Sequence, residues 1–161
     1  MKVSLANILL FSLVLFYLVM LGGGNYEQLN VTSLLASAPP ESLAILQGPY
    51  GFNPVKFWVI FRPLTILLFL GAIIFNWRST IRRKLLLTAF TIDCAITLST
   101  FLYFAPETAV LTAPDLYLDS TGVTRIQLWK NLNWIRLGAF YAASLFLLLA
   151  LSKNRNDNHR G

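Results

Sequence analysis

Charged residues are scarce in this chain. Asp, Glu, Lys and Arg make up 12% of its 161 residues, whereas hydrophobic residues make up 56%. A typical soluble domain is roughly 25% charged, so this composition argues against a soluble protein and predicts a membrane protein. The length allows one compact bundle, and we expect residues 1–161 to form a single membrane domain.

Cysteine and histidine each occur once. Because Cys94 is the single cysteine, the chain can form no internal disulfide, no CxxC redox pair and no thiolate metal cluster. Cys94 lies in an apolar run, where we expect a small packing residue. The single His159 excludes a multi-histidine metal or haem site within one chain. A carboxylate-only metal site has little support, so we expect no metal and no cofactor.

Four apolar runs are long enough to cross a bilayer, which takes about 20 helical residues. They cover residues 4–21, 57–77, 85–104 and 132–151. The first run follows Lys2 as in a signal peptide, but it is longer than the roughly 7–15 apolar residues of a signal sequence. We therefore expect this span to be retained. The predicted fold class is an all-α polytopic membrane four-helix bundle.

Basic residues cluster at the ends of the apolar runs. The net charge of +6 could indicate a nucleic-acid partner. The basic residues form no continuous stripe, however, and we expect the lipid bilayer as partner and no nucleic acid. With four spans, eight basic residues share one side, and the positive-inside rule then puts both termini in the cytoplasm. The eight are Lys2, Arg78, Arg82, Arg83, Lys84, Lys153, Arg155 and Arg160.

Two longer connections, residues 22–56 and 105–131, are predicted on the outer side. Residues 39–49 have the proline, acid and glycine signals of a short helix. From Val123 a helical pattern runs into the fourth span without a breaker, with Ser120 or Thr121 as a plausible N-cap. This predicts one long helix that extends beyond the membrane. Residues 30–32 match a glycosylation sequon, a pattern with many false positives.

Three charged residues, Arg62, Asp93 and Arg136, interrupt the apolar runs. A charge in mid-membrane costs about 2.5–3.5 kcal/mol on insertion scales, so it normally faces a partner or a polar cavity. The two arginines lie about 8 and 6 Å below the outer boundary, where their side chains can snorkel outward. Asp93 lies about 16 Å deep and is too short to do so.

Helical spacing places Asp93, Thr97 and Thr100 on one face of the third span. We expect a polar pocket that opens outward, with Asp93 at its floor. Its ligand-binding residues would be Tyr26, Glu27, Arg62, Asp93, Glu107, Asn133 and Arg136. A purely structural interpretation stays open for each group: the arginines as interfacial anchors, Glu27 and Glu107 as their salt-bridge partners, and a protonated Asp93 bonded to Thr97 or to a neighbouring backbone group.

Several short motifs resemble a group of small bacterial four-span proteins of unknown function: GGGNYE at 22–27, PPESL at 39–43 and FW at 57–58. Two others, YFAPE at 103–107 and WKNLNWIR at 129–136, are similar to motifs of the anthrone-oxygenase-like family. This resemblance covers most of the chain. It implies a location in the bacterial inner membrane.

The resemblance also implies a site and an activity. That family contains proposed cofactor-independent oxygenases that act on polycyclic aromatic anthrones. The matching positions are Asn133, Arg136 and, more weakly, Glu107. Many relatives carry a histidine near the start of the last span, and none stands there in this chain.

Three functions are open from the sequence. The first is a binding, structural or accessory subunit that holds a lipid- or quinone-like molecule, in a larger complex or a homo-oligomer. The second is an oxygenase-like enzyme on an apolar aromatic substrate, with Asp93 or Glu107 as base and Arg136 stabilising an oxyanion. The third is proton-coupled transport, which ranks last because no pair of broken helices is visible.

Overall fold

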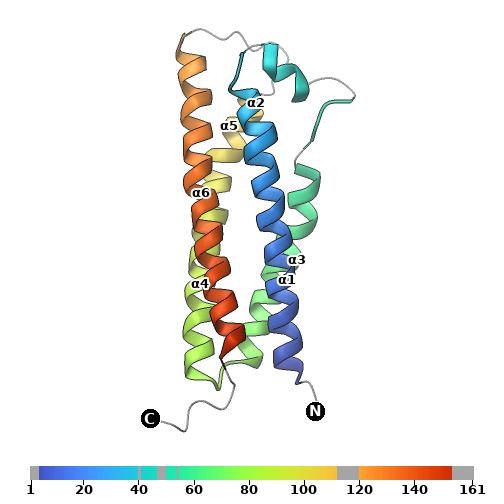
Figure 1. The fold of residues 1–161 in the computed structure, drawn as a ribbon, viewed down its shortest axis with the longest axis vertical. Coiled ribbons are helices and arrows are strands. Elements are labelled where there is room, and N and C mark those ends of the chain that lie inside the picture. Colours follow the sequence, from blue (N-terminus) through green and yellow to red (C-terminus); the bar gives the residue numbers. More distant parts are fainter. Residues whose placement is uncertain (1–3, 40, 47–49, 54, 112–119, 154–161) are drawn as a thin grey trace.

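Four long helices run side by side, antiparallel to their chain neighbours, and form a bundle (Figure 1). The computed structural model describes residues 4–39, 41–46, 50–53, 55–111 and 120–153, which contain no β-strand. The prediction of an all-α four-helix bundle is confirmed. We call the end of the bundle that holds the α3–α4 turn the inner end, and the opposite end the outer end.

Two of the four helices are longer than the predicted spans because π-helical turns join successive segments. Their components, in chain order, are α1 (Leu5–Tyr26), a π-helical segment (Glu27–Thr32), α2 (Ser33–Leu35), a 3₁₀ helix (Glu41–Leu46), α3 (Val55–Phe75), α4 (Thr80–Ser99), a second π-helical segment (Thr100–Phe104), α5 (Ala105–Leu111) and α6 (Ser120–Ser152). The short outer helix and the long last helix expected from the sequence are thus both present.

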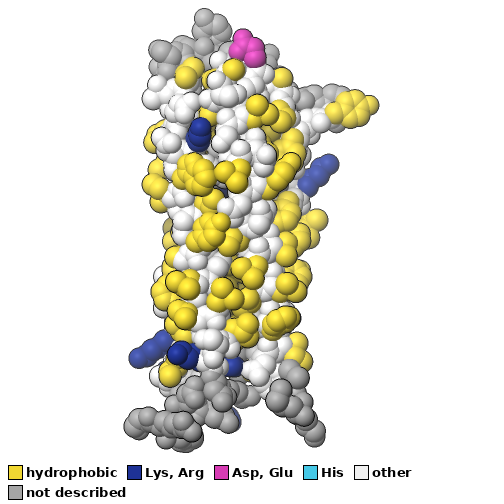
Figure 2. Space-filling model, viewed as in Figure 1, with side chains coloured by type: hydrophobic (Ala, Val, Ile, Leu, Met, Phe, Trp, Pro, Cys, Tyr) yellow, Lys and Arg dark blue, Asp and Glu magenta, His cyan; other side chains and the backbone are white. Residues whose placement is uncertain are grey.

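The surface of the bundle is that of an integral membrane protein. Four helices are long and apolar enough to cross a membrane: Leu5–Leu35, Val55–Phe75, Thr80–Leu111 and Gly122–Ser152. Figure 2 shows apolar side chains over the middle of the visible face and Lys or Arg groups toward its two ends. Large apolar side chains such as Phe101 and Leu102 are more than two-thirds exposed, which suits contact with lipid tails.

The sequence interpretation of residues 22–35 and 105–111 as loop was wrong, because these residues are helical. Glycine disfavours helices, but packing overrides that preference here. A Cβ atom added at Gly23 would lie 2.8 Å from the ring of Phe57, so α1 and α3 approach closely at this point. The sequon at 30–32 lies in this helix, with Asn30 exposed and Thr32 fully buried.

Apolar side chains fill the outer end of the bundle. We name this set the outer apolar cluster: Val31, Leu35, Ala36, Leu43, Phe104, Leu111, Ile126 and Trp129. Leu43 brings the 3₁₀ helix into it, and Ser42 Oγ donates a hydrogen bond of 2.7 Å to the carbonyl of Leu35. Ser120 and Thr121 begin α6, but their side chains, and so the predicted N-cap, lie outside the described residues.

A buried arginine joins the helices at the inner end. Arg82 of α4 donates to Asn7 Oδ1 at 2.7 Å, to Asn76 Oδ1 at 3.0 Å and to the carbonyl of Lys153 at 2.6 and 2.9 Å. Asn76 Nδ2 in turn donates to the carbonyl of Ala6 at 3.2 Å. These bonds connect α1, the α3–α4 turn, α4 and the end of α6. The cationic side chain also suits the negative end of the α6 dipole.

Candidate functional site

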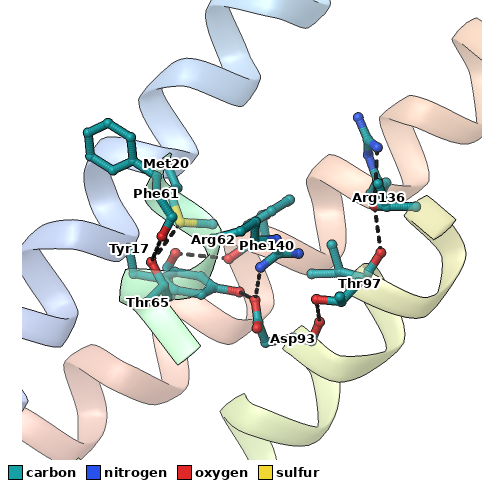
Figure 3. A network of polar contacts seen from close by, with 12 residues as sticks. Tyr17, Met20, Phe61, Arg62, Thr65, Asp93, Thr97, Arg136 and Phe140 are labelled. Carbon is teal, nitrogen blue, oxygen red and sulfur yellow. Dashed lines mark hydrogen bonds and ion pairs between the residues drawn. The ribbon is translucent and has the colours of Figure 1, made fainter. Parts of the chain in front are cut away.

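Asp93 accepts two hydrogen bonds in the middle of the bundle (Figure 3). Tyr17 of α1 donates its hydroxyl to Oδ1 at 3.1 Å, and Arg62 of α3 donates Nη1 to the same oxygen at 2.6 Å. Counted from the inner ends of their helices, all three residues lie about 18–20 Å along the axis. Three helices therefore meet at one buried carboxylate that is 1% exposed.

Two sequence expectations about Asp93 were wrong. Arg62 does not snorkel to the outer surface; it turns inward to form an ion pair with Asp93, because a buried carboxylate needs a compensating charge. Thr97 does not bond the carboxylate either. Its hydroxyl donates 2.8 Å to the backbone carbonyl of Asp93, as helical threonines commonly do to the residue four positions earlier.

Arg136 of α6, unlike Arg62, has no ion-pair partner among the described residues. Its Nη1 donates one long hydrogen bond of 3.4 Å to Thr100 Oγ1, and its guanidinium lies 4.1 Å from the centre of the Phe104 ring. The described residues form two ion pairs with nitrogen–oxygen distances within 4.0 Å, and neither includes Arg136. Glu27 is the carboxylate that acts on its charge from a longer distance. Most of the guanidinium donors therefore have no protein acceptor among the described residues.

Glu27 and two aromatic rings complete the surroundings of Arg136. Trp58 Nε1 donates to Glu27 Oε2 at 2.9 Å. The Trp58 ring lies 6.1 Å from the ring of Phe140, and Phe140 in turn has the Arg62 guanidinium 5.3 Å from its centre. Each arginine thus has its own aromatic partner, Phe140 for Arg62 and Phe104 for Arg136, and Trp58 lies between Glu27 and Phe140.

Both polar groups that face Arg136 begin a π-helical segment. Glu27 begins Glu27–Thr32 and Thr100 begins Thr100–Phe104. π-Helical turns are rare, and within α-helices they are frequent at functional sites. The two segments come from different helices and meet at the same arginine, which supports this position as the candidate site.

Asn133 lies one turn farther outward and has structural partners. Its side-chain amide donates to Gln28 Oε1 and, at 3.4 Å, to Thr32 Oγ1. Gln28 also donates to the carbonyl of Lys130 at 3.4 Å. Asn133, Gln28 and Thr32 are all buried. This polar layer therefore lies on the outer side of the candidate site, beside the outer apolar cluster whose Phe104 contacts Arg136.

Two predicted site residues lie apart from Arg136. Glu107 forms a bidentate pair with Arg125, at 2.9 and 2.8 Å, and not with the arginines of the spans as the sequence suggested. Arg125 is one turn nearer the surface than Trp129, so α5 and the outer part of α6 bring it opposite Glu107. Tyr26 is 60% exposed, and no described side-chain hydrogen bond or ring contact joins it to the residues around Arg136.

The sequence interpretation identified the four charged residues around the candidate site, namely Glu27, Arg62, Asp93 and Arg136. It missed Tyr17 and the role of Trp58. Tyr17 is one of few polar side chains in an uncharged span, which was a usable signal. Trp58 entered the sequence analysis only in the FW motif at 57–58, and nothing in its spacing indicated that its indole donates to Glu27.

Comparisons with protein-family models, with curated proteins and with solved structures found no match to this chain. The resemblance to the anthrone-oxygenase-like family therefore stays a prediction. The chemistry of the site rests on its own geometry: a cation with spare hydrogen-bond donors, a nearby carboxylate and three aromatic rings, all in the outer half of a membrane-spanning bundle.

Proposed function

We propose that this protein is a membrane-embedded binding or accessory protein that holds a lipid- or quinone-like molecule at Arg136. The head of this molecule carries a hydrogen-bond-accepting oxygen, and its body is apolar. The observation that carries the proposal is the state of Arg136, which has one long hydrogen bond and no carboxylate within 4.0 Å among the described residues.

The charge and the N–H donors of a buried arginine need partners. A guanidinium has five N–H donors, and an arginine within a span normally faces a partner or a polar cavity. Arg62 satisfies that rule through Asp93, whereas Arg136 has Thr100 and the face of Phe104. An oxygen of a bound head group would supply the missing acceptor. The rings of Phe104 and Trp58 would contact the apolar body of the molecule.

A titration of decylubiquinone into the detergent-solubilised protein tests this proposal. Trp58 lies beside the site, so bound quinone is expected to quench tryptophan fluorescence in a saturable manner. Arg136→Gln should weaken binding by about 10- to 100-fold, because a hydrogen bond from a charged donor contributes about 1.5–3 kcal/mol. Mass spectrometry of lipids retained after purification in mild detergent would identify the natural ligand and any partner subunit.

Arg83→Gln is the matched control, because Arg83 lies at the inner end and contacts Trp77. This variant should bind decylubiquinone as the wild type does. Equal binding by the Arg136 and Arg83 variants, or quenching that never saturates, would contradict a site at Arg136.

An oxygenase-like enzyme acting on an apolar aromatic substrate is the alternative. The position of Glu27 favours it, since a carboxylate beside Arg136 can act as a base next to an oxyanion-stabilising cation. The bases proposed from the sequence, Asp93 and Glu107, are both engaged in ion pairs. Dioxygen uptake with anthrone as substrate, lost in Glu27→Gln, would support the enzyme; no uptake by the wild type would reject it.

A further inference from the structure

The outer half of α3 is loosely packed compared with its inner half. All four buried residues of α3, the first of them Thr65, lie on the inner side of Pro63. None of residues 55–64 is buried. Pro63 lacks the N–H that would bond the preceding turn, so the helix is weakened where its packing changes. The two halves of α3 therefore have different environments.

The outer half of α3 contacts mainly α1. Phe61 packs on Phe16 with ring centres 5.9 Å apart, Phe57 meets Gly23, and Trp58 bonds Glu27. Over its whole length α3 packs more extensively on α1 than on α4. The outer half of α3 thus leans toward α1.

Contacts between α3 and α4 are confined to the inner and middle levels. Phe69 packs on Phe90 at 5.3 Å, and Arg62 pairs with Asp93 one level farther outward. Among the described residues, no ring contact, hydrogen bond or ion pair joins α3 to α4 beyond that pair. The Arg62–Asp93 pair therefore marks the outermost point at which these two helices are joined.

The continuous helix made of α4, the second π-helical segment and α5 is also incompletely packed on its inward face. From Leu86 to Leu111, the residues that follow one another at intervals of three or four form the face that packs into the bundle. All of them are buried except Thr100. Leu86, Ala89, Asp93, Ile96, Phe104, Glu107 and Leu111 are all buried. Thr100 is partly exposed, and so is Thr97 beside it. The exposed interval lies between Ile96 and Phe104, at the level where Arg136 donates to Thr100.

The outer end of the bundle, in contrast, is closed above Arg136. Phe104 lies against the guanidinium and belongs to the outer apolar cluster, of which Ile126 is fully buried and Leu43 is 2% exposed. The buried Gln28–Asn133 layer reinforces this closure. A molecule coming from water along the bundle axis would have to displace both layers.

We propose that the molecule held at Arg136 reaches it from the lipid, through the side of the bundle between the outer half of α3 and α4. Its apolar tail remains in the bilayer while its head group passes Thr97 to Arg136, with the Arg62–Asp93 pair as the floor of the passage. This inference rests on the proposed function. It narrows the ligand class to molecules dissolved in the membrane. Because the tail stays in the bilayer, the protein sets no upper limit on its length.

Two comparisons in phosphatidylcholine nanodiscs test the lateral passage. In the wild type, long-chain ubiquinone should displace decylubiquinone at a comparable mole fraction in the bilayer, because its tail stays outside the protein. Thr97→Phe should lower the affinity for decylubiquinone about tenfold, since a ring placed in the passage must be displaced. Leu102→Phe is the control, because Leu102 is 72% exposed on the same helix.

The outcomes separate the two proposals. If the wild type binds decylubiquinone but excludes long-chain ubiquinone, and the Thr97 and Leu102 variants bind alike, the lateral passage is wrong and the binding function stands. If the wild type binds no quinone, the proposed function fails and this inference fails with it. If Thr97→Phe does not fold, the comparison of decylubiquinone with long-chain ubiquinone in the wild type tests the lateral passage on its own.

Discussion

At the residue scale, the two arginines in the outer halves of their spans differ in how their charge is compensated. Arg62 pairs with Asp93 at 2.6 Å, while Arg136 relies on a hydroxyl and an aromatic face. The first arrangement stabilises the bundle and the second leaves donors for a ligand. Two residues of one type, a few ångströms apart in depth, therefore differ in their partners, and it is Arg136 for which we propose a binding role.

Replacing Asp93 by Asn should destabilise the protein by about 3–5 kcal/mol, because Arg62 would then remain as an uncompensated buried charge. Unfolding of the detergent-solubilised protein in increasing SDS measures this loss. The double variant Asp93→Asn with Arg62→Met should be more stable than Asp93→Asn alone, since it removes the orphaned charge. Additive effects of the two substitutions would contradict a direct pair.

The sequence indicated that Asp93 lies deep, but it predicted neither that Arg62 lies level with Asp93 along the helix axes nor which partner each charge meets. Depth follows from counting residues along a helix, and it singled out Asp93, which the structure buries inside the bundle. The partner depends on the rotation of each helix about its axis and on which helices are neighbours. For that reason the sequence placed Arg62 with the outer acids, whereas the bundle brings Asp93 to it.

At the scale of the helices, close approach and loose packing occur in the same element. The outer half of α3 meets α1 at Gly23, yet it has no buried residue, and among the described polar and ring contacts only the Arg62–Asp93 pair joins it to α4. The four spans were predictable from apolar run length. Their outward extensions were not, because residues 22–35 and 105–111 combine glycine, proline and polar residues that become helical only when packed in the outer end.

Gly23→Ala tests the α1–α3 contact. Its new methyl group would lie 2.8 Å from the Phe57 ring, and overpacking of this kind costs about 1–3 kcal/mol. Gly22→Ala is the matched control, since nothing lies within 4 Å of the added atom. The control should be neutral or up to about 1 kcal/mol more stable, because alanine favours helix. SDS unfolding that shows equal midpoints for the two variants would reject the close approach.

At the scale of the whole molecule, the charges at the two ends predict the orientation. Arg78, Arg82, Arg83 and Lys84 lie at the inner end, where α1 begins and α6 ends (Figure 1). By the positive-inside rule this end faces the cytoplasm. The candidate site at Arg136 would then lie in the outer leaflet.

Cysteine labelling in intact cells tests that orientation. In a Cys94→Ser background, Lys56→Cys at the outer end should react with a membrane-impermeant maleimide. Lys84→Cys at the inner end should react only after the cells are permeabilised. Both lysines are exposed, so reactivity reports sidedness and not burial. The reverse labelling pattern would place the candidate site in the cytoplasmic leaflet.

The bonds of Arg82 have a consequence for the order of assembly during synthesis. Arg82 belongs to α4, but two of its hydrogen bonds end on the carbonyl of Lys153, which follows α6. The ribosome releases that carbonyl about 70 residues after Arg82, and at roughly 5–20 residues per second this takes several seconds. The first three helices must therefore wait in the translocation machinery or the bilayer with the inner end incomplete, until α6 and Lys153 supply its last hydrogen bonds.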